Sequence, residues 1–238
     1  MNISFKTKIV AFAISATVTA GAAPLAHADG MQPETSVVIL NEADGETSLN
    51  VKNTDEKPSL LYTQVVDIPE DQDALVMLTP PVTRVEPGET QLVRFLLNSK
   101  EPLKTQRLKR VIFEGIPQRK SEGSAKIGVT VRQNLPLIIH PKGLERNREP
   151  WKLLQWKVEG GRLSVTNDSP YVVRLAQEVT LRPVDKIIDL GRTYVLPGET
   201  LTAEGSAESG ATSITISPAT VYGYSVDTYD APLEIAAR

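Results

Sequence analysis

Cysteine is absent from this sequence of 238 residues, and histidine occurs only twice, at His27 and His140. Without a thiol there is no disulfide framework, no cysteine nucleophile and no thiolate metal site. The spacings of serine hydrolases, zinc proteases, penicillin-binding enzymes and phosphate-binding loops are absent as well. The sequence therefore predicts a protein that is not an enzyme, with no catalytic residue, metal site or cofactor. An enzyme built on carboxylates alone, or on serine and lysine, has no motif to support it.

An excess of positive charge is also lacking, since 26 Lys and Arg face 29 Asp and Glu. A mildly acidic chain without basic runs gives no electrostatic footprint for nucleic acid. Residues 1–28 combine Lys6 and Lys8 with an apolar run and end in Ala26-His27-Ala28, which is typical of a secretory signal peptide cleaved after Ala28. Beyond it no run of about 18 apolar residues could insert into a membrane.

What the remaining chain does contain is a succession of short segments rich in Val, Ile, Thr and Leu. Turn signals such as Asp44-Gly45, Pro87-Gly88 and Pro197-Gly198 separate these segments. Short strands at spacings of about 8–12 residues are typical of an all-β sandwich. The charged stretch 141–150 begins and ends with proline and marks the best domain boundary. We therefore expect β-sandwich domains over residues 29–144 and 151–238, joined by a linker over residues 145–150.

One segment, residues 127–139, is longer than a common strand. At about 3.3 Å per residue it spans roughly 40 Å. Its apolar residues share one parity and so one face: Ile127, Val129, Val131, Leu135, Leu137 and Ile139. Periodicity alone favours a long core strand.

Several local motifs together resemble the periplasmic chaperones of the chaperone–usher pilus pathway. The segment TPPVTRVEPGETQLVRF is similar to that family's TPPxxRLEPGxxQxxRI, and VKNTDEKPSLLYTQV to its VxNxxxxPYLVQxW strand pair. FEGIP, LPLIIHP, NDSPYVV and YVLPGET also have counterparts in the family, in the same order along the chain. The matches run from about Val37 to Asp230, which is almost the whole chain after the signal.

The resemblance implies two immunoglobulin-like sandwiches set in an L and a periplasmic chaperone function. Such a chaperone lends a strand to an incomplete pilus subunit and delivers the subunit to an outer-membrane usher. Aligned through Pro141, the donor residues are Ile127, Val129 and Val131, while Leu135, Leu137 and Ile139 belong to the domain's own core. The short loop before the strand resembles the family's short-loop subgroup. Whether the free protein covers this strand in a self-capping dimer is left open.

The family's carboxylate anchor is absent from this sequence. Its arginine would fall at Ser36 or Val37, and its lysine falls at Pro136. The candidate substitutes are Arg132, Asn134 and Ser36, with Arg110 a weaker one.

Other family positions can be carried over singly. The inter-domain ionic cluster corresponds to His140, Gln106 and Asp227, which allows a pair between His140 and Asp227, with a hydrogen-bonded structural histidine as the alternative. The family's usher-contacting face corresponds to Thr79, Arg94 and Ile116.

Two other functions stay open on the sequence. A secreted adhesion or binding module of tandem sandwiches would place its ligand in the end loops. A pilus subunit would be a single sandwich of about 150 residues with an N-terminal donor extension, which this chain does not resemble.

Overall fold

The structure, a computed structural model, describes residues 30–117, 131–204, 207, 210–219 and 226–235. Within these ranges the chain forms strands and a single short 3-10 helix, which confirms the all-β expectation. The elements in chain order are β1 (Met31–Pro33), β2 (Val38–Asn41), β3 (Glu46–Asn53), β4 (Ser59–Val66), β5 (Val76–Thr79), β6 (Val82–Val85), β7 (Thr90–Leu97), β8 (Arg107–Pro117), β9 (Arg132–His140), η1 (Pro150–Leu153), β10 (Gln155–Glu159), β11 (Arg162–Asn167), β12 (Val173–Leu175), β13 (Glu178–Arg182), β14 (Lys186–Asp189), β15 (Tyr194–Val195), β16 (Glu199–Thr202), β17 (Ser213–Ile216), β18 (Pro218–Ala219) and β19 (Tyr229–Ile235).

Strands β1 to β9 form the first domain. One sheet has the strand order β1-β3-β7-β5 and the other has the order β2-β9-β8-β4-β6. The alternation of apolar residues along β3, β7 and β8 turns one face of each strand inward. Fully buried side chains such as Phe95 and Phe113 lie in the core between the two sheets.

The second domain runs from η1 to β19. A large sheet has the order β14-β13-β17-β19-β10-β11-β16, and a small sheet has the order β15-β12-β18. Its core is apolar and contains both tryptophans of the chain, Trp151 and Trp156. No helix among the described residues is long and apolar enough to cross a membrane.

A buried asparagine organises the same corner in both domains. In the first domain, Asn53 donates from Nδ2 to the carbonyl oxygens of Lys57 (3.0 Å) and Val85 (2.9 Å). In the second, Asn167 donates from Nδ2 to the carbonyl oxygens of Tyr171 (2.8 Å) and Val195 (3.2 Å).

The Pro-Gly turns close this corner. The backbone carbonyls of Asn53 and Asn167 accept from the N–H groups of Gly88 (2.9 Å) and Gly198 (2.7 Å), and both glycines have positive φ, 73° and 72°. A positive φ is a conformation that glycine adopts without steric cost. The two domains therefore repeat one local design.

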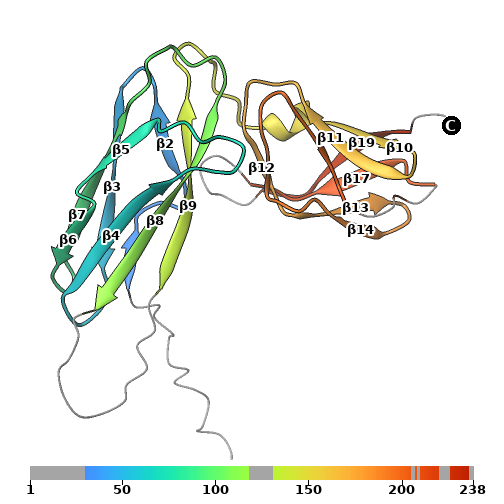
Figure 1. Ribbon diagram of the computed structural model, residues 1–238. Helices are drawn as coiled ribbons and strands as arrows, with labels where there is room; N and C mark the ends of the chain where they lie inside the picture. The colour runs from blue at the N-terminus through green and yellow to red at the C-terminus, as the bar shows by residue number, and fades with distance from the viewer. Residues whose placement is uncertain (1–29, 118–130, 205–206, 208–209, 220–225, 236–238) are drawn as a thin grey trace, which may run out of the picture.

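The two domains meet at an angle, and Figure 1 shows the second sandwich projecting sideways from one end of the first, as the short arm of an L. A small apolar cluster fills the junction. The cluster contains Val172 of the second domain and, from the first domain, Val37, Ile68, Leu108 and Ile138. Tyr194 and Leu196 pack against it. This junction positions the faces that line the inside of the angle.

Candidate functional site

Strand β9 is paired over its whole length on one side only. Against β8 it runs antiparallel from Arg132 to Ile139, whereas β2 pairs in parallel with Leu137 to His140 alone. No described strand pairs with residues 132–136 on the side away from β8. An edge of this kind presents backbone N–H and C=O groups to any extended chain that lies beside it. The long strand is therefore partly a core strand and partly an open edge.

The apolar face of β9 changes from buried to exposed along the strand. Leu137 and Ile139 are fully buried and Leu135 packs against the same core, as expected. Val131, just before β9, is 48% exposed. The other two predicted donor residues, Ile127 and Val129, lie outside the described residues.

A groove of about 360 Å³ accompanies this edge. It is lined by residues 30–36 and by Val131, Gln133 and Leu135. Gln133 closes one side, because its Nε2 donates to the carbonyl of Met31 at 2.7 Å. Ser36 is exposed on this groove, on the opposite face of β9 from Arg132 and Asn134, so the structure does not bring it to them.

The face of β9 opposite the groove carries Arg132 and Asn134. The arginine held most firmly beside this face is Arg110 of β8, not Arg132. Arg132 is exposed, and its Nε lies 3.9 Å from the carboxylate of Glu114. Arg110 of β8 is held more firmly, since it donates from Nε to Asn134 Oδ1 (2.8 Å) and from Nη2 to the Asn134 carbonyl (2.5 Å). Asn134 therefore serves to orient Arg110, the candidate that the sequence ranked lower.

Arg110 is coupled electrostatically to a second arginine that sequence reasoning missed. Arg174 of β12, in the second domain, is partly buried and couples electrostatically to Arg110. Burial lowers the pKa of Arg110, and burial together with the charge of Arg110 lowers the pKa of Arg174. Both guanidinium groups are thus partly withdrawn from water, a setting in which a bound anion gains charge-assisted hydrogen bonds. No motif marks Arg174 in the sequence, because its role depends on how the domains dock.

His140 is a hydrogen-bonded histidine, as in the second of the two interpretations of the sequence, and not a partner of Asp227. Its Nε2 bonds to the carbonyl of Leu144 (2.9 Å) and its Nδ1 to Nε2 of Gln106 (2.9 Å), whereas Asp227 is exposed. A carbonyl only accepts, so Nε2 carries the proton and Nδ1 accepts from the amide. A neutral imidazole with both nitrogens bonded needs no carboxylate, which explains why His140 does not pair with Asp227.

Gln106 carries this neutral contact across the junction. Its Oε1 accepts from the Val172 N–H (2.9 Å), and its own N–H donates to the Pro170 carbonyl (2.8 Å). The family positions of His140 and Gln106 are thus brought together, as an amide–imidazole pair rather than an ionic one.

The three predicted usher-contact residues lie on two different sheets. Thr79 and Arg94 are exposed and directly opposite each other in the β5–β7 pair. Ile116, near the end of β8, lies opposite Leu60 in the other sheet, and both are about two-fifths exposed, at 41% and 40%.

Comparison with known protein families gives two consecutive matches. Residues 30–145 match "Pili and flagellar-assembly chaperone, PapD N-terminal domain", and residues 149–229 match "Pili assembly chaperone PapD, C-terminal domain".

Similar proteins are found by sequence and by structure. A fimbrial chaperone of Escherichia coli strain K12, YhcA, is 44% identical over 203 residues, which is 85% of this chain and 90% of the relative. The chaperone FimB/FhaD of Bordetella pertussis is 30% identical over 68% of this chain and 72% of its own. Among solved structures, the Salmonella enterica SafA pilin in complex with the SafB chaperone superposes with a TM-score of 0.72 at 21% identity, covering 87% of this chain and 98% of the other. The Pseudomonas aeruginosa CupB2 chaperone has a TM-score of 0.68 at 25% identity, covering 84% and 99%.

Proposed function

This chain belongs to the PapD family of pilus-assembly chaperones, and we propose that it completes the fold of a pilus subunit by donor-strand complementation in the periplasm. The donor is the strand that ends in β9, with Ile127, Val129 and Val131 as the side chains inserted into the subunit. The complex then delivers the subunit to an outer-membrane usher. The signal over residues 1–28, cleaved after Ala28, takes the chain to the periplasm.

The half-paired edge of β9 carries this proposal. A strand with one open side and an exposed apolar residue at its end matches the needs of a sandwich that lacks a strand. Each fully buried aliphatic side chain contributes about 1.5–3 kcal/mol, so three of them with the backbone bonds stabilise an incomplete subunit substantially. The adhesion-module alternative is not favoured, because the relatives found by sequence and by structure are chaperones.

The terminal carboxylate of the subunit binds Arg110 and Arg174 in this proposal. Arg110 is already oriented by Asn134, and Arg174 of the second domain is coupled to it electrostatically. A carboxylate bound beside these cations would gain charge-assisted hydrogen bonds. Arg132 contributes less, because Glu114 already lies beside it. The exposed pair Thr79–Arg94 and the exposed Ile116 are the candidate surfaces for the usher.

Substitution of Val129 tests the donor face. Val129→Asp places a charge where an apolar side chain must enter the subunit, so co-purification of the subunit from the periplasm should be lost while both domains remain folded. Ile187→Asp is the matched control, since Ile187 is 61% exposed on β14 of the second domain. A stable complex with the Val129→Asp protein would contradict donor-strand complementation along this face.

A peptide comparison tests the anchor separately. Arg110→Ala should weaken binding of a peptide with the subunit's terminal sequence by about 10- to 100-fold, and an amidated peptide should bind the parent protein and the variant alike. Arg132→Ala is the control and should change affinity little. Equal losses for the free-acid and the amidated peptide would exclude Arg110 as a carboxylate ligand.

A further inference from the structure

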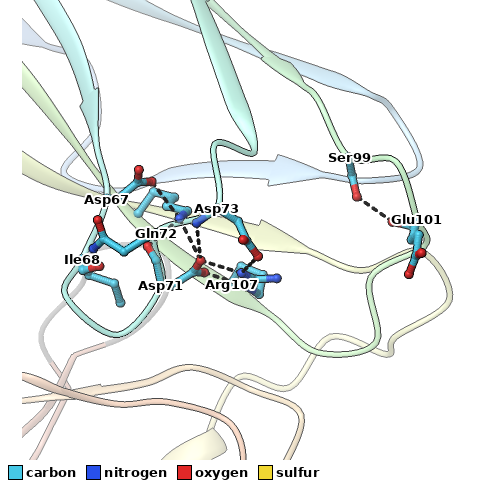
Figure 2. A network of polar contacts seen from close by, with 9 residues as sticks. Asp67, Ile68, Asp71, Gln72, Asp73, Ser99, Glu101 and Arg107 are labelled. Carbon is cyan, nitrogen blue, oxygen red and sulfur yellow. Dashed lines mark hydrogen bonds and ion pairs between the residues drawn. The ribbon is translucent and has the colours of Figure 1, made fainter.

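Residues 67–73, in the loop between β4 and β5, carry an ion pair that joins the two domains, Glu70 with Arg192. The loop is compact, because the N–H of Asp71 donates to the Ile68 carbonyl (3.1 Å) and Nε2 of Gln72 donates to the same oxygen (2.5 Å). Figure 2 shows it curled around a group of charged side chains.

A buried ionic cluster fastens this loop to the first domain. Lys109 of β8 is fully buried, and its Nζ pairs with Asp67 (2.7 Å) and Asp71 (2.9 Å). The same Nζ donates to the Asp71 carbonyl at 2.7 Å. Arg107 adds bonds from Nε to Asp71 Oδ2 (2.6 Å) and from Nη2 to Asp73 Oδ2 (2.8 Å).

The cluster keeps the carboxylate of Asp71 in the charged form. Burial by itself would raise the pKa of Asp71, but the hydrogen bonds and charges of Arg107 and Lys109 outweigh burial and lower it. Since a buried charge is costly unless it is fully paired, the loop is held in one position by the need to keep these pairs intact.

The tip of this loop reaches the second domain. Glu70 forms an ion pair with Arg192 and accepts a hydrogen bond from the Tyr194 hydroxyl at 2.9 Å. Arg192 stacks on the Tyr194 ring, 4.9 Å from its centroid, and also pairs with Glu199. The neighbouring Ile68 inserts into the apolar junction beside Tyr194.

These contacts differ in kind from the rest of the junction. The hydrogen bonds from Gln106 to Val172 and Pro170 join neutral groups and the Ile68 cluster is apolar, whereas the Glu70–Arg192 bond is charge-assisted and is therefore of the stronger kind. Glu70 belongs to a rigid loop, and Arg192 is held between two carboxylates and a ring. The pair therefore joins two rigid bodies at a fixed point away from the linker.

We infer that Glu70 and Arg192 are positioning residues that set the angle between the two domains, and with it the separation of Arg110 and Arg174. The link to subunit capture rests on the proposed chaperone function, whereas the angle itself does not. The pair acts through domain orientation and touches no subunit.

The absence of cysteine makes the test direct, because two introduced cysteines are labelled specifically. Nitroxide labels at Lys52→Cys and Glu178→Cys, both exposed and in different domains, report the inter-domain distance of the free protein by pulsed electron resonance. With Glu70 and Arg192 intact we expect one narrow distance peak. Glu70→Gln and Arg192→Gln should each lose that peak, and the double variant should lose little more than Arg192→Gln alone, because the pair is then already broken.

Glu46→Gln is the matched control, since Glu46 pairs with Arg94 inside the first domain and its loss should leave the peak unchanged. Melting followed by circular dichroism confirms that each variant remains folded. A narrow, unshifted peak in the Glu70→Gln protein would overturn the inference.

A second measurement separates this inference from the proposed function. Subunit binding by Glu70→Gln should weaken about fivefold or more if the angle matters for capture. A broadened distance with unchanged subunit affinity would reject the role in capture and keep the role in orientation. Loss of all subunit binding by the Val129→Asp protein, with its distance peak intact, would support the proposed function without bearing on the domain angle.

Discussion

The two domains share a corner but differ in what they bury. Each contains a fully buried asparagine, Asn53 or Asn167, whose backbone carbonyl accepts a hydrogen bond from the glycine of a Pro-Gly turn. The second domain adds no other buried polar side chain among its described residues, and its core is apolar around two tryptophans. The first domain buries charged and polar groups as well, among them Lys109, Asp71 and Gln106.

This difference indicates that the two domains have different structural roles. These three buried groups of the first domain lie toward the junction, where Lys109 and Asp71 hold the loop that reaches Arg192, and Gln106 joins His140 to Val172. The first domain also carries the open edge of β9. The second domain serves as a rigid apolar body whose position the first domain fixes.

Removing the buried lysine should have the largest effect on the difference in stability between the two domains. Lys109→Met leaves Asp71 and Asp67 without their shared cation, and we expect the first domain to lose about 3–5 kcal/mol of stability. Both tryptophans lie in the second domain, so tryptophan fluorescence should still report its unfolding near the original midpoint, while circular dichroism detects an earlier transition. A loss below about 1 kcal/mol would mean that the buried cluster is not a structural requirement.

The shared corner should respond alike in both domains. Asn53→Ala and Asn167→Ala each remove the donor to two backbone carbonyls, and each should cost about 1–3 kcal/mol in its own domain. Denaturant unfolding, followed by fluorescence for the second domain and by circular dichroism for the whole chain, measures both losses. Clearly unequal losses would show that the two corners are similar in geometry but not in energy.

Lowering the pH should also distinguish the stabilities of the two domains, with a smaller effect than the substitutions. The pKa of Asp71 and that of Glu70 are lowered in the folded protein, despite burial, by their hydrogen bonds and by the cations beside them. A lowered pKa means that the stabilisation is complete above the ordinary carboxyl pKa of about 4 and is lost as the pH falls through the folded value. In the second domain Asp189 also has a lowered pKa, because the Gly191 N–H and Gln177 donate to it, but it is an exposed group.

We therefore expect the first domain to unfold at a higher pH than the second during acid titration from pH 5 downward. The two transitions are followed by circular dichroism and by tryptophan fluorescence at constant ionic strength. Simultaneous transitions in the parent protein, or an unchanged order in an Asp71→Asn protein, would contradict this assignment.

Much of the fold and part of the site could be predicted from local pattern. Period-two alternation placed Leu137 and Ile139 in the core and Arg132 and Asn134 on the opposite face, because successive side chains of any strand point to opposite sides. Turn residues located the corners at Gly88 and Gly198 for an equally local reason. The order of the motifs identified the family before any contact was known.

Contacts between the domains could not be predicted in this way. The sequence left a pair between His140 and Asp227 open and ranked Arg132 above Arg110, whereas the structure pairs His140 with Gln106 and orients Arg110 on Asn134. Arg174, Glu70 and Arg192 had no motif at all. Their partners in the other domain are more than 60 positions away in the sequence. These contacts depend on how two rigid sandwiches dock.

The sequence by itself determined the strands, their faces, the two-domain organisation and the family, because each of these follows from the order of nearby residues. Only the tertiary structure decided which charges meet: Lys109 with Asp71 inside the first domain, and Glu70 with Arg192 between the domains. The physical reason is that hydrophobic alternation is set by backbone geometry within one strand, whereas an ion pair depends on the position of a partner that another part of the chain supplies.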